Sequence, residues 1–383
     1  MKKYLRRSAV QLTLCGAFFV LFNHNCQSQE PWNYKAISKA NQISEVVVES
    51  AGFYNLIESL PKNFVKDASV DYTSFIQKAL DKNRKVKFPD FPILINEEGL
   101  NISNNSTIIF PKGGKVYMEP NSLGSYAVFK LRNVVNVQIF NPVIIGERDK
   151  HVGKTGEWGM GISIEGGRNI VITNAHISKC WGDGIYITNA KTVSNNIEIK
   201  NSVLDYNRRN GLTITGGKNI LIQNLISTNT YGTLPMAGID IEPNNSRVIL
   251  DSITIVNYQS YNNFRSGLQI GLSRLPNPGA RTLSVIAEHM DIDGSDIGIL
   301  VGGFYKSYPI GSKVKGEISI RSVKISNTRQ PVSLARNYQF GPLINFKNFN
   351  FYKGKSGKLF KDVEQESFFL KRLKEEKTIK IIQ

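Results

Sequence analysis

Gly161-Ile162-Ser163-Ile164 is the first of six copies of one pattern, in which a glycine is followed by apolar residues at alternate positions. The later copies begin 23 to 31 residues apart, and they are Gly184-Ile185-Tyr186-Ile187, Gly211-Leu212-Thr213-Ile214, Gly238-Ile239-Asp240-Ile241, Gly267-Leu268-Gln269-Ile270 and Gly298-Ile299-Leu300-Val301. Alternation of this kind is typical of a strand with one buried face. Because no repeat has room for a crossover helix, each repeat predicts one coil of a solenoid.

A second alternating stretch follows each copy, beginning with Asn169-Ile170-Val171-Ile172. An asparagine then recurs in register at Asn174, Asn201 and Asn224. We predict that these side chains form a ladder that bonds to the backbone of neighbouring coils. Stacked coils bury their isoleucine rows at the ~4.8 Å spacing of a sheet. The predicted fold class is therefore all-β, a right-handed parallel β-helix, because parallel crossovers are almost always right-handed.

The two ends of the chain predict a leader and two caps. Residues 1–25 join a basic start to an apolar run of 14 residues, which is typical of a signal peptide, and Cys26 directly after it is a candidate for lipidation. We expect export to the periplasm, the cell surface or the medium, with no transmembrane helix left after the signal is removed. Residues 26–60 predict a linker, residues 61–352 the β-helix catalytic domain, and residues 353–383 a charged cap or tail. The apolar spacing predicts capping helices over residues 70–80 and 363–373.

The composition favours a folded protein with an acidic partner. The 383 residues are 41% hydrophobic and 21% charged, which is enough for a packed core. The formal net charge of +17 predicts attraction to a polyanion, and export favours an acidic polysaccharide or oligosaccharide over nucleic acid. Cys180 is the one cysteine beyond residue 26, so neither a disulfide framework nor a zinc site is expected. We expect a monomer.

The stretch from Asp71 to Pro89, a capping helix followed by Lys85-Val86-Lys87-Phe88-Pro89, resembles the pectate-lyase-like superfamily of right-handed β-helix proteins, as do the Gly-Ile-x-Ile coils. The resemblance covers residues 60–350 and implies the fold and a role on acidic or complex glycans. The superfamily includes polysaccharide lyases, glycoside hydrolases, uronate epimerases and phage tailspikes, so the resemblance does not select a reaction. The Asn-Thr-Asp, His-Gly and Arg-Ile-Lys elements of polygalacturonases do not occur in the sequence, nor does the Asp-Pro-His motif of alginate epimerases.

The strand pattern brings chemically useful side chains to one face. Because the isoleucines of each strand face inward, the second and fourth residues after the glycine face outward. Six candidate catalytic residues lie on these outward columns or just before the strands: Asp183, Tyr186, Arg208, Arg209, Asp240 and Glu242. They fall on neighbouring coils, and we predict that they form the active site.

Long insertions flank the same strands at residues 146–159, 229–235 and 272–281. Loops on both sides of a flat strand face would make a groove for a glycan chain. Cations in such a groove suit carboxylate or sulfate groups, and aromatic rings suit sugar rings. The predicted substrate-binding residues are His151, Lys154, Trp158, Trp181 and Arg265.

The preferred reaction is β-elimination at a uronic acid, by a polysaccharide lyase or by a dehydratase at a uronate chain end. In that reaction Arg208, Arg209 and Arg265 could neutralise the uronate carboxylate, and His151, Tyr186 or Lys154 could exchange protons. The first alternative is a glycoside hydrolase that uses the carboxyl groups of Asp183, Asp240 and Glu242. The same three groups could ligate calcium, the one cofactor that the sequence leaves open. The second alternative is a β-helix that binds glycans without catalysis.

Overall fold

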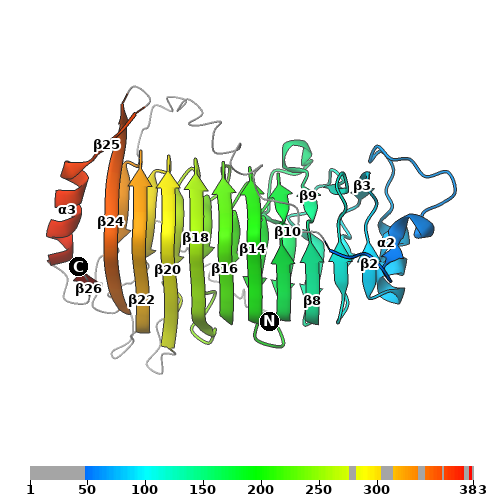
Figure 1. Ribbon diagram of the computed structural model, residues 1–383, viewed down its shortest axis with the longest axis horizontal. Coiled ribbons are helices and arrows are strands. Elements are labelled where there is room, and N and C mark those ends of the chain that lie inside the picture. Colours follow the sequence, from blue (N-terminus) through cyan, green and yellow to red (C-terminus); the bar gives the residue numbers. More distant parts are fainter. Residues whose placement is uncertain are drawn as a thin grey trace, which may run out of the picture. The chain divides into compact units, whose positions relative to one another are not determined.

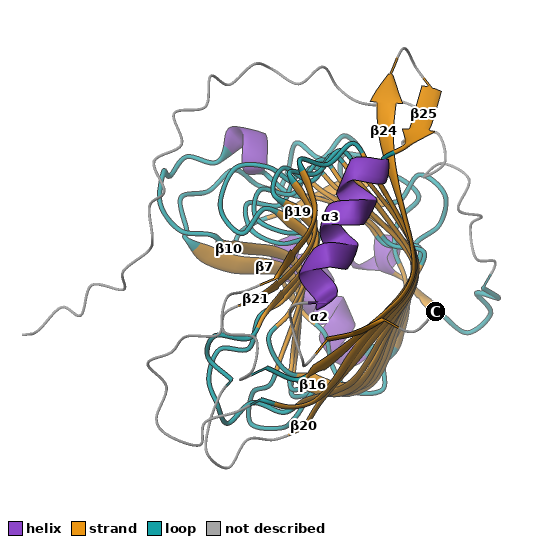
Figure 2. Cartoon of the chain, turned by 90° about the vertical axis from the view of Figure 1, so that its left-hand side faces the viewer, coloured by secondary structure: helices purple, strands orange, loops and turns teal. Residues whose placement is uncertain are grey.

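The computed structural model describes residues 48–275, 282–302, 314–334, 341–355, 358–374 and 379–381. The predicted signal peptide and Cys26 lie outside these residues. The described chain is a β-solenoid, as the repeats predict, and its coils stack in chain order (Figure 1). Its strands form two sheets, which enclose the core between them (Figure 2).

The six glycine-containing copies form six adjacent strands of a nine-stranded sheet, here called sheet B. Its strands, in chain order, are β4 (Leu100–Asn101), β7 (Ser125–Arg132), β10 (Trp158–Glu165), β13 (Ile185–Thr188), β15 (Leu212–Ile214), β17 (Ala237–Ile241), β19 (Ser266–Gly271), β21 (Ile297–Gly302) and β23 (Gln330–Leu334). Neighbouring strands are parallel, and the register aligns Ile185 with Leu212 and Leu212 with Ile239. The copies therefore stack residue upon residue, as their pattern predicts.

The remaining strands form sheet A, which has seventeen strands. They are β1 (Tyr54–Asn55), β2 (Lys85–Lys87), β3 (Pro92–Ile95), β5 (Thr107–Ile109), β6 (Lys115–Met118), β8 (Val135–Phe140), β9 (Val143–Ile145), β11 (Arg168–Thr173), β12 (His176–Ser178), β14 (Asn195–Asp205), β16 (Gly217–Thr228), β18 (Leu250–Tyr261), β20 (Thr282–Asp293), β22 (Lys315–Ser326), β24 (Leu343–Lys355), β25 (Lys358–Lys361) and β26 (Ile379–Ile381). Strands β11 and β12 both pair with β14, so the long strand of one coil lies beside two consecutive short strands of the preceding coil.

The core consists of the inward rows of both sheets. Ile185, Leu212 and Ile239 of sheet B are completely buried, as are Ile197 and Ile220 of sheet A. At about 1.5–3 kcal/mol for each buried aliphatic side chain, these rows supply the main stabilisation of the stack.

Asparagines mark the bends of sheet A. Asn174, Asn201 and Asn224 take positive φ angles of 58°, 51° and 54°, a region that asparagine tolerates better than most residues. Asn224 Nδ2 donates a hydrogen bond of 2.7 Å to Asn201 Oδ1 one coil away, and Asn174 Nδ2 donates in the same way to Asn141 Oδ1. The predicted ladder is present, but its bonds join side chains to side chains rather than to backbone, because the coil spacing brings each amide to the next.

Both described ends of the solenoid carry helices. Helix α2 (Thr73–Lys82) buries Ile76 and Leu80 at the N-terminal end, and α3 (Val363–Lys374) lies at the other end (Figure 1), where Phe369 is 5.4 Å from the ring of Phe346. The linker boundary at residue 60 needs correction, because β1 pairs with β2 and the 3-10 helix η1 (Leu56–Ser59) buries Leu56. Among the described residues, the helices are too short or too polar to cross a bilayer.

Candidate functional site

A cleft of about 460 Å³ opens on the outward side of sheet B. Ten residues line it: Glu157, Trp158, Arg209, Leu234, Pro235, Glu242, Asn244, Arg265, Gln269 and Arg274. They come from the strands and from the described parts of all three predicted insertions, so the cleft lies where the sequence predicts a groove. We call these ten residues the cleft.

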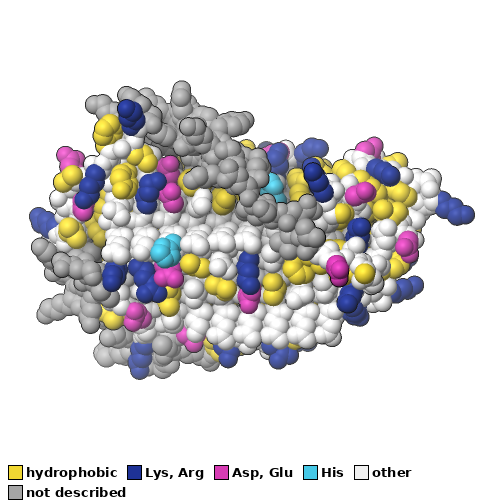
Figure 3. Space-filling model, in the orientation of Figure 1, with side chains coloured by type: hydrophobic (Ala, Val, Ile, Leu, Met, Phe, Trp, Pro, Cys, Tyr) yellow, Lys and Arg dark blue, Asp and Glu magenta, His cyan; other side chains and the backbone are white. Residues whose placement is uncertain are grey.

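A larger groove of about 860 Å³ lies on sheet A. It runs along a second asparagine ladder, and Glu198 is the one charged residue in its lining. Figure 3 shows this sheet from outside, with broad uncharged bands between scattered charges. The groups that could perform acid–base chemistry are therefore concentrated in the smaller cleft on sheet B.

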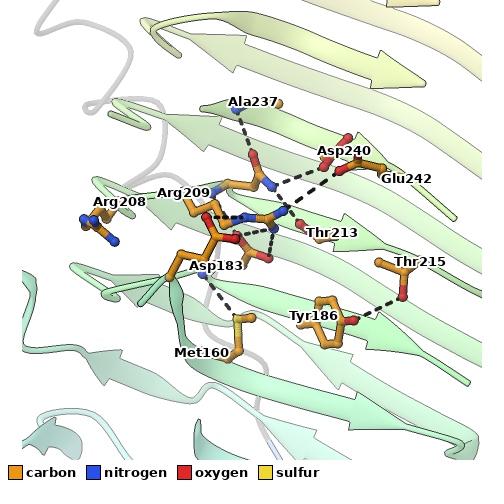
Figure 4. A network of polar contacts seen from close by, with 12 residues as sticks. Met160, Asp183, Tyr186, Arg208, Arg209, Thr213, Thr215, Ala237, Asp240 and Glu242 are labelled. Atoms are coloured by element: carbon orange, nitrogen blue, oxygen red, sulfur yellow. Dashed lines mark hydrogen bonds and ion pairs between the residues drawn. The ribbon is translucent and has the colours of Figure 1, made fainter. Parts of the chain in front are cut away.

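Arg209 is the centre of the charged network beneath the cleft. The turn between β14 and β15 carries it, and its backbone N–H donates to Gly182 O of the preceding coil. Its side chain is 11% exposed, and Nη1 lies 3.1 Å from Asp183 Oδ2 (Figure 4). Burial alone would lower the pKa of Arg209, but Asp183, Asp240, Glu157 and Glu242 together raise it above its ordinary value. The guanidinium is therefore a permanent cation.

Asp183 holds Arg209 from below. It is completely buried, and Oδ1 accepts a hydrogen bond of 3.0 Å from the backbone N–H of Asn210. Burial raises the pKa of Asp183, while Arg209, Thr213 and Asn210 oppose that rise. Asp183 does not line the cleft, so the structure gives it the role of fixing the position of the guanidinium.

Asp240 is a second buried carboxyl group, and the sequence analysis expected it at the surface. It points outward from β17 as predicted, but Gln269 Nε2 donates to its Oδ1 at 3.1 Å and Asn210 Nδ2 donates to its Oδ2 at 3.4 Å. These side chains and the loops of adjacent coils leave it no exposed surface. Burial and the nearby Glu242 carboxyl group raise the pKa of Asp240 well above its ordinary value. Asp240 therefore retains its proton at pH values where a free aspartic acid has lost it.

Two carboxyl groups line the cleft close to Arg209. Glu157 Oε2 lies 3.8 Å from Arg209 Nε, and Glu242 Oε2 lies 3.9 Å from Arg209 Nη2. The two side chains are 38% and 37% exposed. The sequence analysis missed Glu157, because in the 146–159 insertion it selected only cations and aromatic residues. The signal available was the position of Glu157 at the strand end of that insertion, directly before Trp158.

The other cleft residues suit an acidic sugar chain. Trp158 is 51% exposed and presents its ring to the cleft. Arg265 and Arg274 also line it, and neither guanidinium has an ion-pair partner among the residues that the structure describes. A guanidinium without a carboxylate partner can form two parallel hydrogen bonds to a carboxylate or sulfate group.

Three predicted site residues form a separate stack outside the cleft. The rings of His151 and Trp181 are parallel with centroids 3.7 Å apart, and the Arg208 guanidinium lies 3.7 Å from the Trp181 ring. Two groups cannot both lie this close over one face without overlapping, so they cover opposite faces of the indole. The His151 side chain has no exposed surface and Trp181 is 9% exposed.

This stack corrects the roles that the sequence analysis gave to its members. Trp181 has no free face for a sugar, and His151 is held by Glu147, whose Oε1 lies 2.9 Å from its Nδ1. Arg208 Nη1 donates to Gly156 O at 2.9 Å and lies apart from the Asp183–Arg209 network (Figure 4). Arg208 therefore anchors the 146–159 insertion rather than facing substrate.

The remaining predicted residues lie at the margins of the cleft. The Tyr186 hydroxyl is 3.2 Å from Thr215 Oγ1 and accepts a hydrogen bond of 3.5 Å from Asn244, which does line the cleft. Lys154 is exposed on the insertion but is not part of the lining. In the described part of the chain, no three His, Cys, Asp or Glu side chains converge as a metal site made of such ligands requires, and this includes Asp183, Asp240 and Glu242.

Comparison with known proteins agrees with the fold. The model of the right-handed β-helix region matches residues 91–251 and 155–277. Protein YclG of Bacillus subtilis (strain 168), described as uncharacterized, is 30% identical over 229 residues, which is 52% of this chain and 38% of that protein. The chain thus spans about two fifths of the length of this relative and less of a second B. subtilis protein, of which it covers 28%.

Two solved structures show the same architecture. The A-module of the mannuronan C-5 epimerase AlgE6 of Azotobacter vinelandii has a TM-score of 0.55 and 15% identity, covering 79% of this chain and 87% of the module. The polygalacturonase of Erwinia carotovora ssp. carotovora has a TM-score of 0.50 and 15% identity, covering 83% of this chain and 96% of the enzyme. The fold and the matching family model define the class: the chain is a right-handed parallel β-helix protein.

Proposed function

We propose that the protein is an enzyme that hydrolyses an acidic polysaccharide, or oligosaccharides derived from it, in the cleft on sheet B. The observation that carries this proposal is the pair of partly exposed carboxyl groups, Glu157 and Glu242, that line one cleft within 4 Å of the same guanidinium. Glycoside hydrolysis requires two carboxyl groups that flank the scissile bond, one as acid and the other as base or nucleophile. Glu157 and Glu242 replace the buried Asp183 and Asp240 as the pair that meets the sugar.

The buried residues then prepare this pair rather than touch substrate. Asp183 fixes Arg209 from below, and Arg209 lies within 4 Å of both cleft carboxyl groups. A cation close to two carboxylates offsets the repulsion between them and limits their movement. Groups held in place before the substrate arrives do not have to be ordered during the reaction, and this lowers its barrier.

The acidic character of the substrate follows from the cations of the cleft. Arg265 and Arg274 can bind carboxylate or sulfate groups, and Trp158 can stack on a sugar ring. The net charge of +17 agrees with a polyanionic partner, and the likeness to a mannuronan epimerase and a polygalacturonase agrees with a polysaccharide. We also propose that the protein acts outside the cytoplasm, as the leader over residues 1–25 predicts.

β-Elimination is the second candidate, and the same two cations favour it. Arg265 or Arg274 could neutralise a uronate carboxylate, which makes the neighbouring C5 proton removable by a base such as Glu242. Loss of a sugar from C4 would make the protein a lyase, and loss of a hydroxyl at a chain end would make it a dehydratase. Either reaction leaves a C4=C5 double bond in the product, whereas hydrolysis does not.

The deciding experiment measures two products at once. Purified protein is incubated with a panel of polyuronates, sulfated polysaccharides and their oligosaccharides, while new reducing ends and near-ultraviolet absorbance are followed. We expect reducing ends without a rise in absorbance. Glu157→Gln and Glu242→Gln should each lower kcat by about 100-fold or more, because each removes an acid–base group. The matched control is Glu198→Gln, since Glu198 is 39% exposed on sheet A and should leave kcat unchanged.

Two results would overturn the hydrolytic proposal. A rise in absorbance that matches the reducing ends would assign elimination instead. Binding of a polyanion without any product, unchanged in both glutamine variants, would show a β-helix that binds glycans without catalysis. Where the enzyme is active, the variants Glu157→Gly and Glu242→Gly assign the two roles. Added azide should restore activity to the variant that lacks the base or nucleophile, and it should not restore activity to the variant that lacks the acid.

A further inference from the structure

A row of flat side chains lies on the turns that lead into sheet B. Backbone hydrogen bonds from Arg208 N to Cys180 O, Tyr231 N to Asn207 O and Phe264 N to Thr230 O align four positions on successive coils. The aligned positions are Trp181, Arg208, Tyr231 and Phe264. The row therefore follows the axis of the solenoid, parallel to the direction in which the strands stack.

The two halves of this row differ in exposure. The half at Trp181 is sealed, because His151 and Arg208 cover both faces of the indole. The half at Tyr231 and Phe264 is open: these rings are 54% and 51% exposed, with centroids 5.5 Å apart. Tyr206, 38% exposed and two residues before Arg208, contacts the same Arg148 guanidinium as Tyr231. We call Tyr206, Tyr231 and Phe264 the aromatic strip.

A cation lies against the aromatic strip. The Arg148 guanidinium is 3.9 Å from the ring of Tyr206 and 5.6 Å from that of Tyr231. Its Nη1 donates to Tyr206 O at 2.8 Å, so the guanidinium is fixed beside the rings. A fixed cation next to exposed rings offers one site for an anionic substituent and one for an apolar ring face.

The aromatic strip adjoins the cleft along the chain. Phe264 directly precedes Arg265, and Tyr231 begins the segment that brings Leu234 and Pro235 to the cleft. A polymer that leaves the cleft on this side would pass over the strip. With successive coils ~4.8 Å apart, three positions span about 10 Å, the length of a short stretch of sugars.

Packing does not explain the strip. Rings that remain 38–54% exposed contribute only part of the hydrophobic stabilisation of a buried aromatic residue. Exposed aromatic residues gathered in one place, rather than scattered singly, mark interaction surfaces. Both neighbouring features, the fixed Arg148 and the cleft, favour an acidic glycan as the partner.

We propose that the aromatic strip and Arg148 bind the segment of the acidic polysaccharide that extends beyond the cleft. The C–H faces of sugar rings stack on Tyr231 and Phe264, and the guanidinium of Arg148 pairs with a carboxylate or sulfate of the same chain. This inference rests on the proposed function, because it assumes a polysaccharide that occupies the cleft. It adds that the protein prefers long chains to short ones.

The test compares a long substrate with a short one. The substrates are the polymer of the panel that the wild-type protein cleaves best and the shortest of its oligosaccharides that is still cleaved. The double variant Tyr231→Ala/Phe264→Ala should raise KM for the polymer about 10-fold and leave kcat and KM for the oligosaccharide unchanged. The matched control is Phe368→Ala, which removes a ring that is 57% exposed on α3 at the C-terminal cap.

The possible outcomes distinguish a failure of this inference from a failure of the proposed function. If the wild-type protein neither binds nor cleaves any member of the panel, the proposed function fails and the inference with it. If the wild-type protein is active but the double variant keeps its KM for the polymer, the inference alone is overturned. An equal loss on polymer and oligosaccharide also overturns it, because the damage would then lie in the cleft. Affinity electrophoresis of Glu242→Gln with and without the double substitution measures binding without turnover, and the form that carries the double substitution should be retarded less.

Discussion

The outward faces of the two sheets differ in how their polar side chains are placed and how deeply these are buried. Both are built from strands that turn every second side chain outward. On sheet A, exposed amides such as Asn196 and Asn219 bond to one another across the coils, and nearby charged side chains such as Glu198 stay partly exposed. On sheet B the outward positions hold Asp240 and Thr213, which are buried under other side chains beside a buried guanidinium.

This difference separates what the fold needs from what a function needs. An amide ladder satisfies its own hydrogen bonds, and the charged side chains of sheet A stay partly exposed to water, so this face loses little hydration on folding. Burying Asp183, Asp240 and Arg209 requires the loss of their hydration, and a buried ion pair rarely recovers more than that loss. A face that keeps such a network where a ladder would suffice is the face where chemistry is expected.

The largest expected effect on stability comes from breaking the network of sheet B at its centre. Arg209→Met removes the cation that faces Asp183, Glu157 and Glu242, and it leaves the carboxyl group of Asp183 buried without a counter-charge. We expect the free energy of unfolding to fall by about 3–5 kcal/mol. Denaturant titration followed by circular dichroism measures this change.

The same substitution on sheet A provides the contrast. Arg321 pairs with Glu288 at 2.7 Å, but the two side chains are 43% and 26% exposed. Arg321→Met should therefore cost less than about 1 kcal/mol. Equal losses in the two variants would mean that the faces differ in composition alone and not in energetics.

A middle-sized effect is expected from the ladder of sheet A. Asn196 has a φ of 56°, donates to Asn169 Oδ1 at 3.0 Å and accepts from Asn219 at 3.3 Å. Asn196→Ala puts a Cβ without a compensating hydrogen bond into the left-handed region and removes both bonds, at a cost of about 2 kcal/mol. Asn196→Gly should cost less, because glycine adopts this conformation freely. If alanine and glycine are equally destabilising in thermal unfolding, backbone conformation is not what the ladder secures.

The sequence predicts the fold well because the fold is a repeat. The glycine-containing copies fix the register of sheet B, and Asn174, Asn201 and Asn224 mark the bends of sheet A. Each coil meets only its neighbours, so a local pattern carries almost all the information about packing. The β1 strand was missed because two residues are too few to show alternation.

The site is predicted less completely, because it depends on how loops cover a strand face. Alternation correctly turns Asp240 outward, but it cannot show that Gln269 and Asn210 of adjacent coils bury it. In the same way, a list of aromatic residues suggests Trp181 as readily as Trp158. Only the fold shows that the faces of Trp181 are occupied, whereas Trp158 is 51% exposed. The exposed fraction of an outward side chain depends on tertiary structure, and the repeat pattern does not predict it.

The smallest expected effect is a pH dependence of stability, and it distinguishes the two buried aspartates of sheet B from each other. Asp183 contacts Arg209 directly, whereas Asp240 is bonded to amides and lies near the carboxyl group of Glu242. Burial raises the pKa of Asp240 in the folded state, so the folded protein holds a proton that the unfolded chain releases near the ordinary value of 3.8. Stability contributed by this proton is complete below that value and is lost as pH rises toward the folded-state pKa.

Asp240→Asn should remove this loss, because an amide cannot ionise. The difference in melting temperature between the variant and the wild type should therefore shift in favour of the variant as the pH rises from 4 upward, with both measured by calorimetry in the same buffers. Asp251→Asn, on sheet A, controls for the removal of one negative charge. A difference that stays constant with pH would show that Asp240 ionises in the folded protein as readily as in the unfolded chain. The buried carboxyl group would then be no more costly than an amide of the ladder, and the contrast between the two faces would rest on Arg209 and Asp183 alone.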